Sequence, residues 1–243
     1  YAGSCVVIEE FLVGEEASFI VMVDGSNILP MATSQDHKAR DNGDKGPNTG
    51  GMGAYSPAPI VSETIFENVM HTVIRATVDA MVSEGTPYTG FLYAGLMIDE
   101  SNGVKVLEYN CRFGDPETQP IMMRLKSNLA SLCIAATQGK LDEVTVEWDE
   151  RACLGVVMAA DGYPEKYAKG EKIELPNDSF NSKIFHAGTK INNNKIYSNG
   201  GRVLCATALG KDIQQAQTRA YEFLEKVDWQ GSYYRTDIGF KAI

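Results

Sequence analysis

The sequence predicts an α+β protein with two domains. Strand-like and helix-like stretches are both present, but they do not alternate as the regular units of a parallel α/β fold would. An amphipathic helical pattern covers residues 62–85, and the pair Asn102-Gly103 between two apolar runs is a hairpin signal. The 243 residues exceed the usual length of one domain, about 100–200 residues, and the pattern changes near residue 150. We therefore expect domains at 1–150 and 151–243.

Composition and charge exclude several classes of protein. A net charge of -10 argues against a nucleic-acid partner, which would require a basic face. The longest apolar runs have about half of the roughly 20 residues that cross a bilayer, and no basic-then-apolar leader is present, so we expect a soluble chain without a membrane partner. The five cysteines are scattered without zinc-ligand spacing, which is typical of reduced core cysteines in a cytoplasmic protein.

The first part of the chain contains two predicted strands and a long loop. Residues 5–13 and 17–25 are rich in β-branched and aromatic residues, and an acidic turn at 14–16 joins them. Residues 34–59 have glycine, asparagine, aspartate or proline at nearly every other position, so we expect neither helix nor strand there. A loop of this length inside a domain usually has a function or is disordered.

Helices and further strands follow this loop. Ser62 is a suitable N-cap for the helix over 62–85, and Gly85 supplies its C-terminal stop. Residues 90–99 and 104–110 are predicted to form the two strands of the hairpin, and residues 121–138 a second helix that Gly139 closes. Beyond Cys153 we expect short strands and one helix over 212–227. The face of the first helix that we expect to be buried consists of Ile65, Phe66, Val69, Val73, Ala76, Ala80 and Met81.

The second hairpin strand ends in two oxygen-bearing side chains. Side chains alternate along a strand, so Glu108 and Asn110 share one face. A two-residue turn at Asn102-Gly103 would place Glu108 opposite Met97 and Asn110 opposite Gly95. A carboxylate and an amide oxygen suit Mg²⁺ or Mn²⁺ better than zinc. The alternative is a polar strand end that faces solvent.

Two other segments have features of a ligand site. The stretch around Glu9 and Glu10 could present backbone groups to an adenine edge, although an exposed acidic hairpin would look similar. In the loop, Gly50, Gly51 and Gly53 allow the backbone to approach an anion, and the alternative is a flexible linker. Asn48 and Thr49 add donors to this loop, and the group Asp36, His37, Lys38 and Arg40, whose basic members add cationic character, stands just before it.

These segments together resemble a known enzyme family. The stretches "VVIEEFLVGEEASF", "QDHKARDNGDKGPNTGGMGAYSPAP", "EYNCRFGDPETQP" and "DERACLGVVMAADGYP" are similar to those of glycinamide ribonucleotide synthetases, also called phosphoribosylamine-glycine ligases, of the ATP-grasp superfamily. The resemblance implies the C-terminal half of an ATP-grasp fold, an antiparallel sheet with packed helices, followed by a smaller mixed α/β domain. It also implies that this chain is the C-terminal portion of a longer enzyme, inactive or nearly so without its N-terminal part.

The resemblance implies a function for each segment. Glu9 begins the hinge, Glu10, Phe11 and Leu12 hold adenine, and Glu16, or alternatively Glu15, binds the ribose. Glu108 and Asn110 match the metal ligands; because Gly95 stands near the place where many relatives have a further acidic ligand, we expect only two from this chain. The loop residues Asn48, Thr49, Gly50 and Gly51 would hold substrate phosphate, with Asp36 and Lys38 in the same binding set.

Arg112 and Asp115 are the catalytic candidates. The planar fork of Arg112 suits the glycine carboxylate or an acyl phosphate, and Asp115 could orient Arg112 or the substrate amine. The implied reaction is the ATP-dependent ligation of glycine to 5-phosphoribosylamine through glycyl phosphate, in purine biosynthesis, with ATP and Mg²⁺ or Mn²⁺ as cofactors. The alternatives are another ATP-grasp ligase, which the stretches "RFGDPETQ" and "GPNTGGMGAYSP" argue against, and a non-catalytic module.

Overall fold

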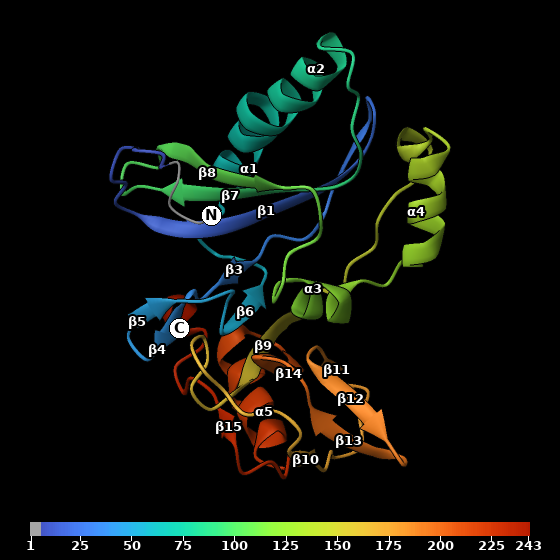
Figure 1. The fold of residues 1–243 in the computed structure, drawn as a ribbon. Coiled ribbons are helices and arrows are strands. Elements are labelled where there is room, and N and C mark those ends of the chain that lie inside the picture. The colour runs from blue at the N-terminus through green and yellow to red at the C-terminus, as the bar shows by residue number, and fades with distance from the viewer. Residues whose placement is uncertain (1–5) are drawn as a thin grey trace.

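The computed structural model describes residues 6–243 and has two lobes (Figure 1). The upper lobe contains a four-stranded sheet in the order β2-β1-β7-β8, covered on one face by a long helical segment. The lower lobe contains a six-stranded sheet in the order β11-β14-β9-β6-β3, with β15 beside β9, and helix α5 packs on it. The paired strands are antiparallel and helices are few, which confirms the α+β class.

The upper sheet is built on one long strand pair. Strand β1 (Glu15–Asp24) pairs with β7 (Thr89–Ile98) along its whole length, and β2 (Ile28–Pro30) and β8 (Val104–Asn110) flank them. The predicted strand over 5–13 is wrong for the residues that the structure describes, since 6–13 form no strand; Cys5 lies outside them. Apolar side chains in this stretch, such as Ile8 and Phe11, are largely exposed, because no neighbouring strand pairs with the segment in the described chain.

The helix over the upper sheet is confirmed, but its buried face changes partway. It runs as α1 (Glu63–Val69), a π-helical turn η1 (Met70–Arg75) and α2 (Ala76–Ser83), and the Ser62 hydroxyl caps it by accepting from the backbone N–H of Ile65. Ile65 and Val69 are buried as predicted. Each π turn contains an extra residue, so the buried face continues at Ile74 and Val78 while Ala76 and Ala80 face solvent.

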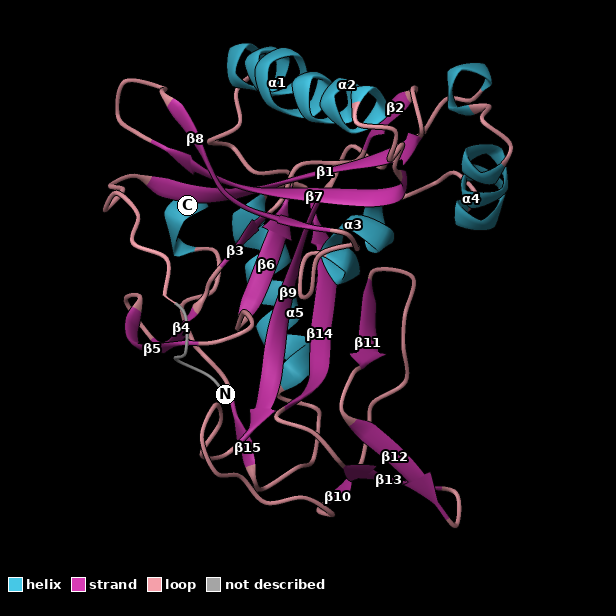
Figure 2. Cartoon of the chain, turned by 45° about the horizontal axis from the view of Figure 1, so that its top comes forward, coloured by secondary structure: helices cyan, strands magenta, loops and turns pink. Residues whose placement is uncertain are grey.

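The predicted structureless loop over 34–59 is wrong. It contains β3 (Gln35–Asp36), β4 (Ala39–Asp41), β5 (Lys45–Asn48) and β6 (Gly53–Ser56). Strand β6 pairs with β9 (Ala152–Ala160), about a hundred residues later, and β3 extends the same sheet. The lower sheet therefore draws strands from both sides of residue 150. Figure 2 shows β6 lying beside β9 beneath the upper sheet.

The predicted single helix over 121–138 is also wrong. It consists of α3 (Thr118–Arg124) and α4 (Leu129–Thr137), which project in different directions in Figure 1. Leu125 between them is extended and forms a β-bridge with Trp148. The side chain of Asn128 caps α4 by accepting from the backbone N–H of Ser131 at 3.1 Å. An asparagine within an apolar periodic pattern can thus begin a new helix instead of continuing the old one.

The last part of the chain completes the lower lobe. Helix α5 begins at a cap in which Asp212 accepts from the backbone N–H of Gln215 at 2.8 Å, and its buried side chains pack against β14 and β9. None of the helices formed by residues 6–243 has the length and apolar character that crossing a membrane would require. The remaining elements are β10 (Lys172–Ile173), β11 (Ser182–His186), β12 (Thr189–Asn192), β13 (Lys195–Ser198), β14 (Arg202–Gly210), α5 (Ile213–Leu224), β15 (Ser232–Tyr233), η2 (Leu141–Glu143) and η3 (Phe240–Ala242).

The shifted helix face predicts which substitutions destabilise the upper lobe. Ile74→Ala should lower the free energy of unfolding by about 2–5 kcal/mol, because the fully buried side chain leaves a cavity. Ala76→Gln, at an exposed position that the uninterrupted pattern would bury, should change it by less than about 1 kcal/mol. Urea unfolding measures both values. A larger loss for Ala76→Gln than for Ile74→Ala would contradict the change of face.

Candidate active site

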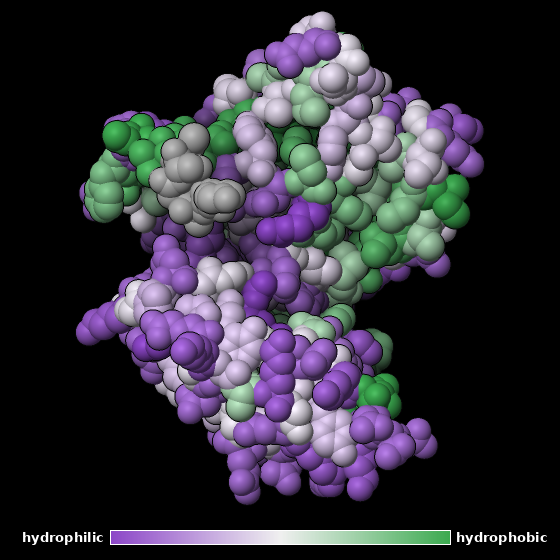
Figure 3. Space-filling view, in the orientation of Figure 1, coloured by the Kyte–Doolittle hydropathy of each residue, from purple (hydrophilic) through white to green (hydrophobic). Residues whose placement is uncertain are grey.

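Polar side chains gather where the two lobes meet. Figure 3 shows hydrophilic residues in this band, while hydrophobic ones lie on the outer parts of the upper lobe. The band is formed by the face of the upper sheet that points away from α1 and α2, by the strands β3 to β5, and by the turn that follows β8. Most of the residues that the sequence analysis selected lie on these elements.

A β-bulge decides how the predicted metal pair is placed. The chain turns over residues 99–103, with the Asp99 carboxylate accepting from two backbone N–H groups, so the predicted two-residue turn is wrong. One extra residue, Leu107, shifts the register between β7 and β8. Glu108 therefore lies opposite Gly95, and Asn110 opposite Tyr93. The glycine makes room for Glu108 and not, as predicted, for Asn110, since a Cβ there would lie 3.3 Å from the Glu108 Cγ.

Glu108, Asn110 and Arg112 form an exposed chain of contacts. The Asn110 amide donates to Glu108 Oε1 at 3.0 Å, and Arg112 Nη2 donates to Asn110 Oδ1 at 3.4 Å. With the Asn110 amide turned over, so that its oxygen replaces the nitrogen beside Glu108, the two side chains would fit a hard divalent cation, which takes most of its remaining ligands from water and phosphate. Within residues 6–243, no group of three or more histidine, cysteine or acidic side chains is arranged to hold a metal.

A charged cavity lies next to this pair. It has a volume of about 160 Å³ and is lined by residues that include Glu16, Asp36, Lys38 and Asn48. Lys38 Nζ forms an ion pair with Glu16 Oε2 at 2.9 Å. Burial, together with the nearby charges of Glu117 and Glu16, raises the pKa of Asp36 to about 8, although Lys38 opposes the shift. Burial lowers the pKa of Lys38, but Asp36 and Glu16 outweigh it and hold that pKa above its ordinary value.

The glycine-rich loop is held from the lower lobe by Arg202, a residue that the sequence analysis missed. Its Nη1 donates to the carbonyls of Gly50 at 2.6 Å and Asp115 at 2.8 Å, and its Nη2 donates to Asp115 Oδ2 at 2.8 Å. A Cβ at position 50 would lie 2.8 Å from the guanidinium, so only glycine permits this approach. Thr49 closes the loop by accepting from the backbone N–H of Gly51 at 3.0 Å.

Asp115 is therefore engaged on both carboxylate oxygens. Oδ2 accepts from Arg202, and Oδ1 accepts from Gln119 Nε2 at 3.1 Å. Arg112 donates instead to the backbone carbonyl of Phe113 and to Asn110. The turn that follows β8 thus presents Arg112 to solvent, while Asp115 ties the turn to the lower lobe.

A buried polar cluster behind the cavity was also missed. The Ser18 hydroxyl donates to Glu117 Oε1 at 2.7 Å and lies 3.1 Å from the Tyr93 hydroxyl. Glu117 is only 2% exposed. Burial, followed by the charge of Glu117, raises the pKa of Tyr93. The serine inside the apolar stretch of β1 was the available signal, since an isolated polar residue in a buried strand usually has a polar partner.

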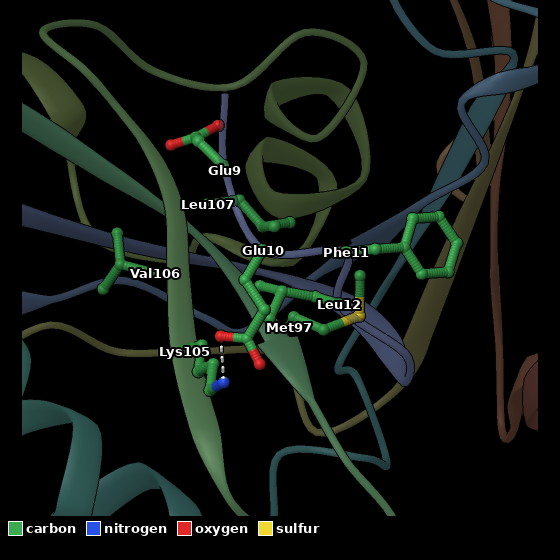
Figure 4. A pocket seen from close by; sticks show the side chains of 8 residues that line it. All are labelled: Glu9, Glu10, Phe11, Leu12, Met97, Lys105, Val106 and Leu107. Atoms are coloured by element: carbon green, nitrogen blue, oxygen red, sulfur yellow. Dashed lines mark hydrogen bonds and ion pairs between the residues drawn. The ribbon is translucent and has the colours of Figure 1, made fainter. Parts of the chain in front are cut away.

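The predicted hinge borders a second pocket of about 330 Å³ (Figure 4). Glu10 points toward β8 and pairs with Lys105 Nζ at 2.6 Å, and Leu12 lies near Met97. Phe11 points away from the pocket and is 90% exposed. The pocket wall on the other side is the edge of β8, at Val106 and Leu107.

Comparison with known proteins agrees with this architecture. Residues 1–118 match the family model for the ATP-grasp (A) domain of phosphoribosylglycinamide synthetase, and residues 153–241 match that for its C domain. The chain is 62% identical over 244 residues to a phosphoribosylamine--glycine ligase of Vibrio cholerae and 61% identical over 245 residues to that of Salmonella typhimurium. All of this chain and 57% of each relative are covered, so the chain spans little more than half of their length.

Solved structures give the same result. The crystal structure of a phosphoribosylamine--glycine ligase from Thermotoga maritima matches 95% of this chain and 57% of its own, with a TM-score of 0.85 and 36% identity. A biotin carboxylase from Campylobacter jejuni matches 93% of this chain and 48% of its own at a TM-score of 0.68, but at 13% identity this likeness shows the fold alone. The chain belongs to the phosphoribosylglycinamide synthetase family, because two domain models of this family match it in order and close relatives match it along its whole length.

Proposed function

We propose that this chain contains the catalytic cleft of an ATP-dependent ligase that joins glycine to 5-phosphoribosylamine. The observation that carries the proposal is the convergence, between the lobes, of the Glu108 and Asn110 pair, the charged cavity and the loop held by Arg202. The names of the relatives supply the substrates. We further propose that activity requires a segment equivalent to the part of the relatives that this chain does not cover.

ATP would lie between the hinge and the cavity. Glu9, Glu10, Phe11 and Leu12 line the pocket beside β8, and their backbone groups would meet the adenine edge there. Glu16 lines the nearby cavity and would bind the ribose hydroxyls after giving up its ion pair with Lys38. Glu108 and Asn110 would hold Mg²⁺ or Mn²⁺, which would neutralise phosphate charge when bound.

The remaining residues would bind and align the other substrates. Arg112 is exposed at the end of β8 and has donor groups available for the glycine carboxylate or an acyl phosphate. Residues Asn48, Thr49, Gly50 and Gly51, together with Lys38, would hold substrate phosphate. Asp115 would act by keeping the turn of Arg112 in place. Alignment of this kind can account for much of the acceleration of a ligation.

The wider assignments are proposals of the same kind. We propose a division into an ATP-grasp part at 1–150 and a C-terminal domain at 151–243, with β3 and β6 contributed by the first to the sheet of the second. The partners would be glycine, phosphoribosylamine, ATP and the uncovered part of the enzyme, and not nucleic acid or a membrane. The net charge of -10 supports this choice, and unpaired cysteines at four described positions support a cytoplasmic location.

Reconstitution tests the proposed reaction. The chain should be fused behind the portion of the Vibrio cholerae relative that it does not cover, with the chain alone as the control. The fusion should release ADP only when glycine and phosphoribosylamine are both present, and the chain alone should release little. ADP release that is indifferent to glycine would contradict the proposed substrates, and full activity of the chain alone would contradict the need for a further segment.

Glu108→Gln tests the metal pair in the reconstituted enzyme. Loss of the charged ligand should raise the Mg²⁺ concentration needed for half-maximal rate and lower kcat by roughly 100-fold or more, since metal assistance contributes several kcal/mol. Glu100→Gln, on the exposed turn of the same hairpin, should change neither value. An unchanged metal dependence in Glu108→Gln would remove Glu108 from the site.

Arg112→Ala tests the glycine contact. The KM for glycine should rise by about 10-fold or more, because a charged hydrogen bond contributes about 1.5–3 kcal/mol, while the KM for ATP stays close to that of the wild type. Arg75→Ala, on the outer helix, is the matched control. Wild-type glycine affinity and turnover in Arg112→Ala would exclude this role.

A further inference from the structure

Asp36 is a buried carboxylate that lines the central cavity. It is 6% exposed, and a contact with its own backbone N–H offsets little of the effect of burial on its pKa. Lys38, the cation that attracts it electrostatically, forms its ion pair with Glu16 instead. Burying a carboxylate with so little compensation is costly, and such groups are often kept for a chemical reason.

Asp36 lies against the glycine-rich loop and also lines the cavity. Gly51 of the glycine-rich loop has no side chain, and a Cβ there would lie 3.4 Å from Asp36 Oδ2 while colliding with the ring of Pro116. Asp36 therefore stands at the junction of the loop and the turn that follows β8. The charge of Glu108 also influences Lys38 at the cavity wall, so the candidate metal pair lies close by.

The charged groups that face Asp36 set its proton affinity. Burial contributes most, the charges of Glu117 and Glu16 act in the same direction, and Lys38 acts against them, which raises the pKa of Asp36 to about 8. Glu117 itself is tied to the Ser18 hydroxyl at 2.7 Å and is more deeply buried. Of these two carboxylates, Asp36 is therefore the more accessible to a substrate. A general base is most effective when its pKa lies near the working pH, and the raised pKa of Asp36 meets this condition.

We propose that Asp36 is the catalytic base of the amide-forming step, accepting the proton that the amine nitrogen of phosphoribosylamine loses. This inference rests on the proposed function. The nitrogen lone pair attacks the acyl carbon of glycyl phosphate, the bond from that carbon to the phosphate oxygen breaks, and inorganic phosphate leaves with the electron pair. The nitrogen passes one proton to Asp36, which later releases it to water. Phosphoryl transfer from ATP to glycine needs no such base and is independent of Asp36.

Asp36→Asn in the reconstituted enzyme separates the two steps. Glycine-dependent positional isotope scrambling of the ATP bridging oxygen reports glycyl phosphate formation, and glycinamide ribonucleotide release reports the amide step. The variant should keep scrambling within about threefold of the wild type and lose roughly 100-fold or more in amide formation, the usual contribution of a general base. Asp161→Asn, an exposed aspartate in the turn after β9, should leave both rates unchanged.

The pH dependence supplies a second readout. In the wild type, the rate of the amide step should rise with pH up to about 8, because Asp36 loses its proton and becomes a free base. This rise should be absent in Asp36→Asn and partly kept in Asp36→Glu. Since native Asp36 holds its proton to higher pH than the unfolded chain, wild-type stability should fall between about pH 4 and pH 8, and Asp36→Asn should lack that fall. This unfolding measurement does not depend on activity and also shows that the variant folds.

Three results decide the matter. Amide formation within about threefold of the wild type in Asp36→Asn would overturn the role of Asp36 while leaving the proposed function intact. Equal losses in scrambling and amide formation would overturn it too, because Asp36 would then bind or support the site generally. An absence of glycine-dependent scrambling in the wild type would instead overturn the proposed function, and this inference with it.

Discussion

The pairing of β6 with β9 is the contact on which the arrangement of the cleft depends. Residues 53–56 lie in register with residues 153–156, so a short segment from the first half of the chain becomes an inner strand of the lower sheet. Strand β3 then forms the edge of that sheet, and Ser34 just before it forms a bridge to Ser18 of β1. The two sheets are thereby joined by a few residues, and Asp36 and Lys38 are carried to the cavity at this junction.

Ion pairs from the C-terminal tail hold the opposite side of the same segment. Arg235 is fully buried and donates to Asp237, to Asp44 at 2.8 Å and to the carbonyl of Ala39 at 3.0 Å. Lys241 adds a second contact to Asp44 at 2.7 Å and lines the cavity. Removing one partner from such a buried cluster is strongly destabilising, because it leaves an uncompensated charge. The hairpin of β4 and β5 is thus fixed from below, as Arg202 fixes the glycine-rich loop.

The cleft concentrates negative charge that the fold only partly neutralises. The charges of Glu117 and Glu16 act on Asp36 together with the cation Lys38, and Glu108 lies close enough to act on Lys38. Like charges this close raise the energy of one another unless a proton, a cation or a ligand intervenes. A divalent cation would supply that compensation if Glu108 and Asn110 held one, and a bound proton supplies it at Asp36. The same imbalance would favour both of the proposed events, the binding of a cation and the transfer of a proton.

Local sequence patterns determined the features that depend on neighbouring residues. The helix over 62–85 with its cap at Ser62, the α+β class and the candidate residues of the metal pair all follow from periodicity, capping and side-chain chemistry. Family resemblance in the motifs added the roles that we propose for these residues. These signals come from residues a few positions apart, so they do not depend on the fold of the rest of the chain.

Only the tertiary structure decided features whose partners are distant in the sequence. The short strands within 34–59 exist because β9 satisfies the backbone of β6, and the helix over 121–138 breaks because Leu125 pairs with Trp148. The bulge at Leu107 sets which side chains of β8 face the cleft, and Arg202 reaches Gly50 across 152 positions. A backbone hydrogen bond or guanidinium contact of this kind leaves no periodic trace in the sequence, because its energy depends on where the folded chain brings its donor and acceptor.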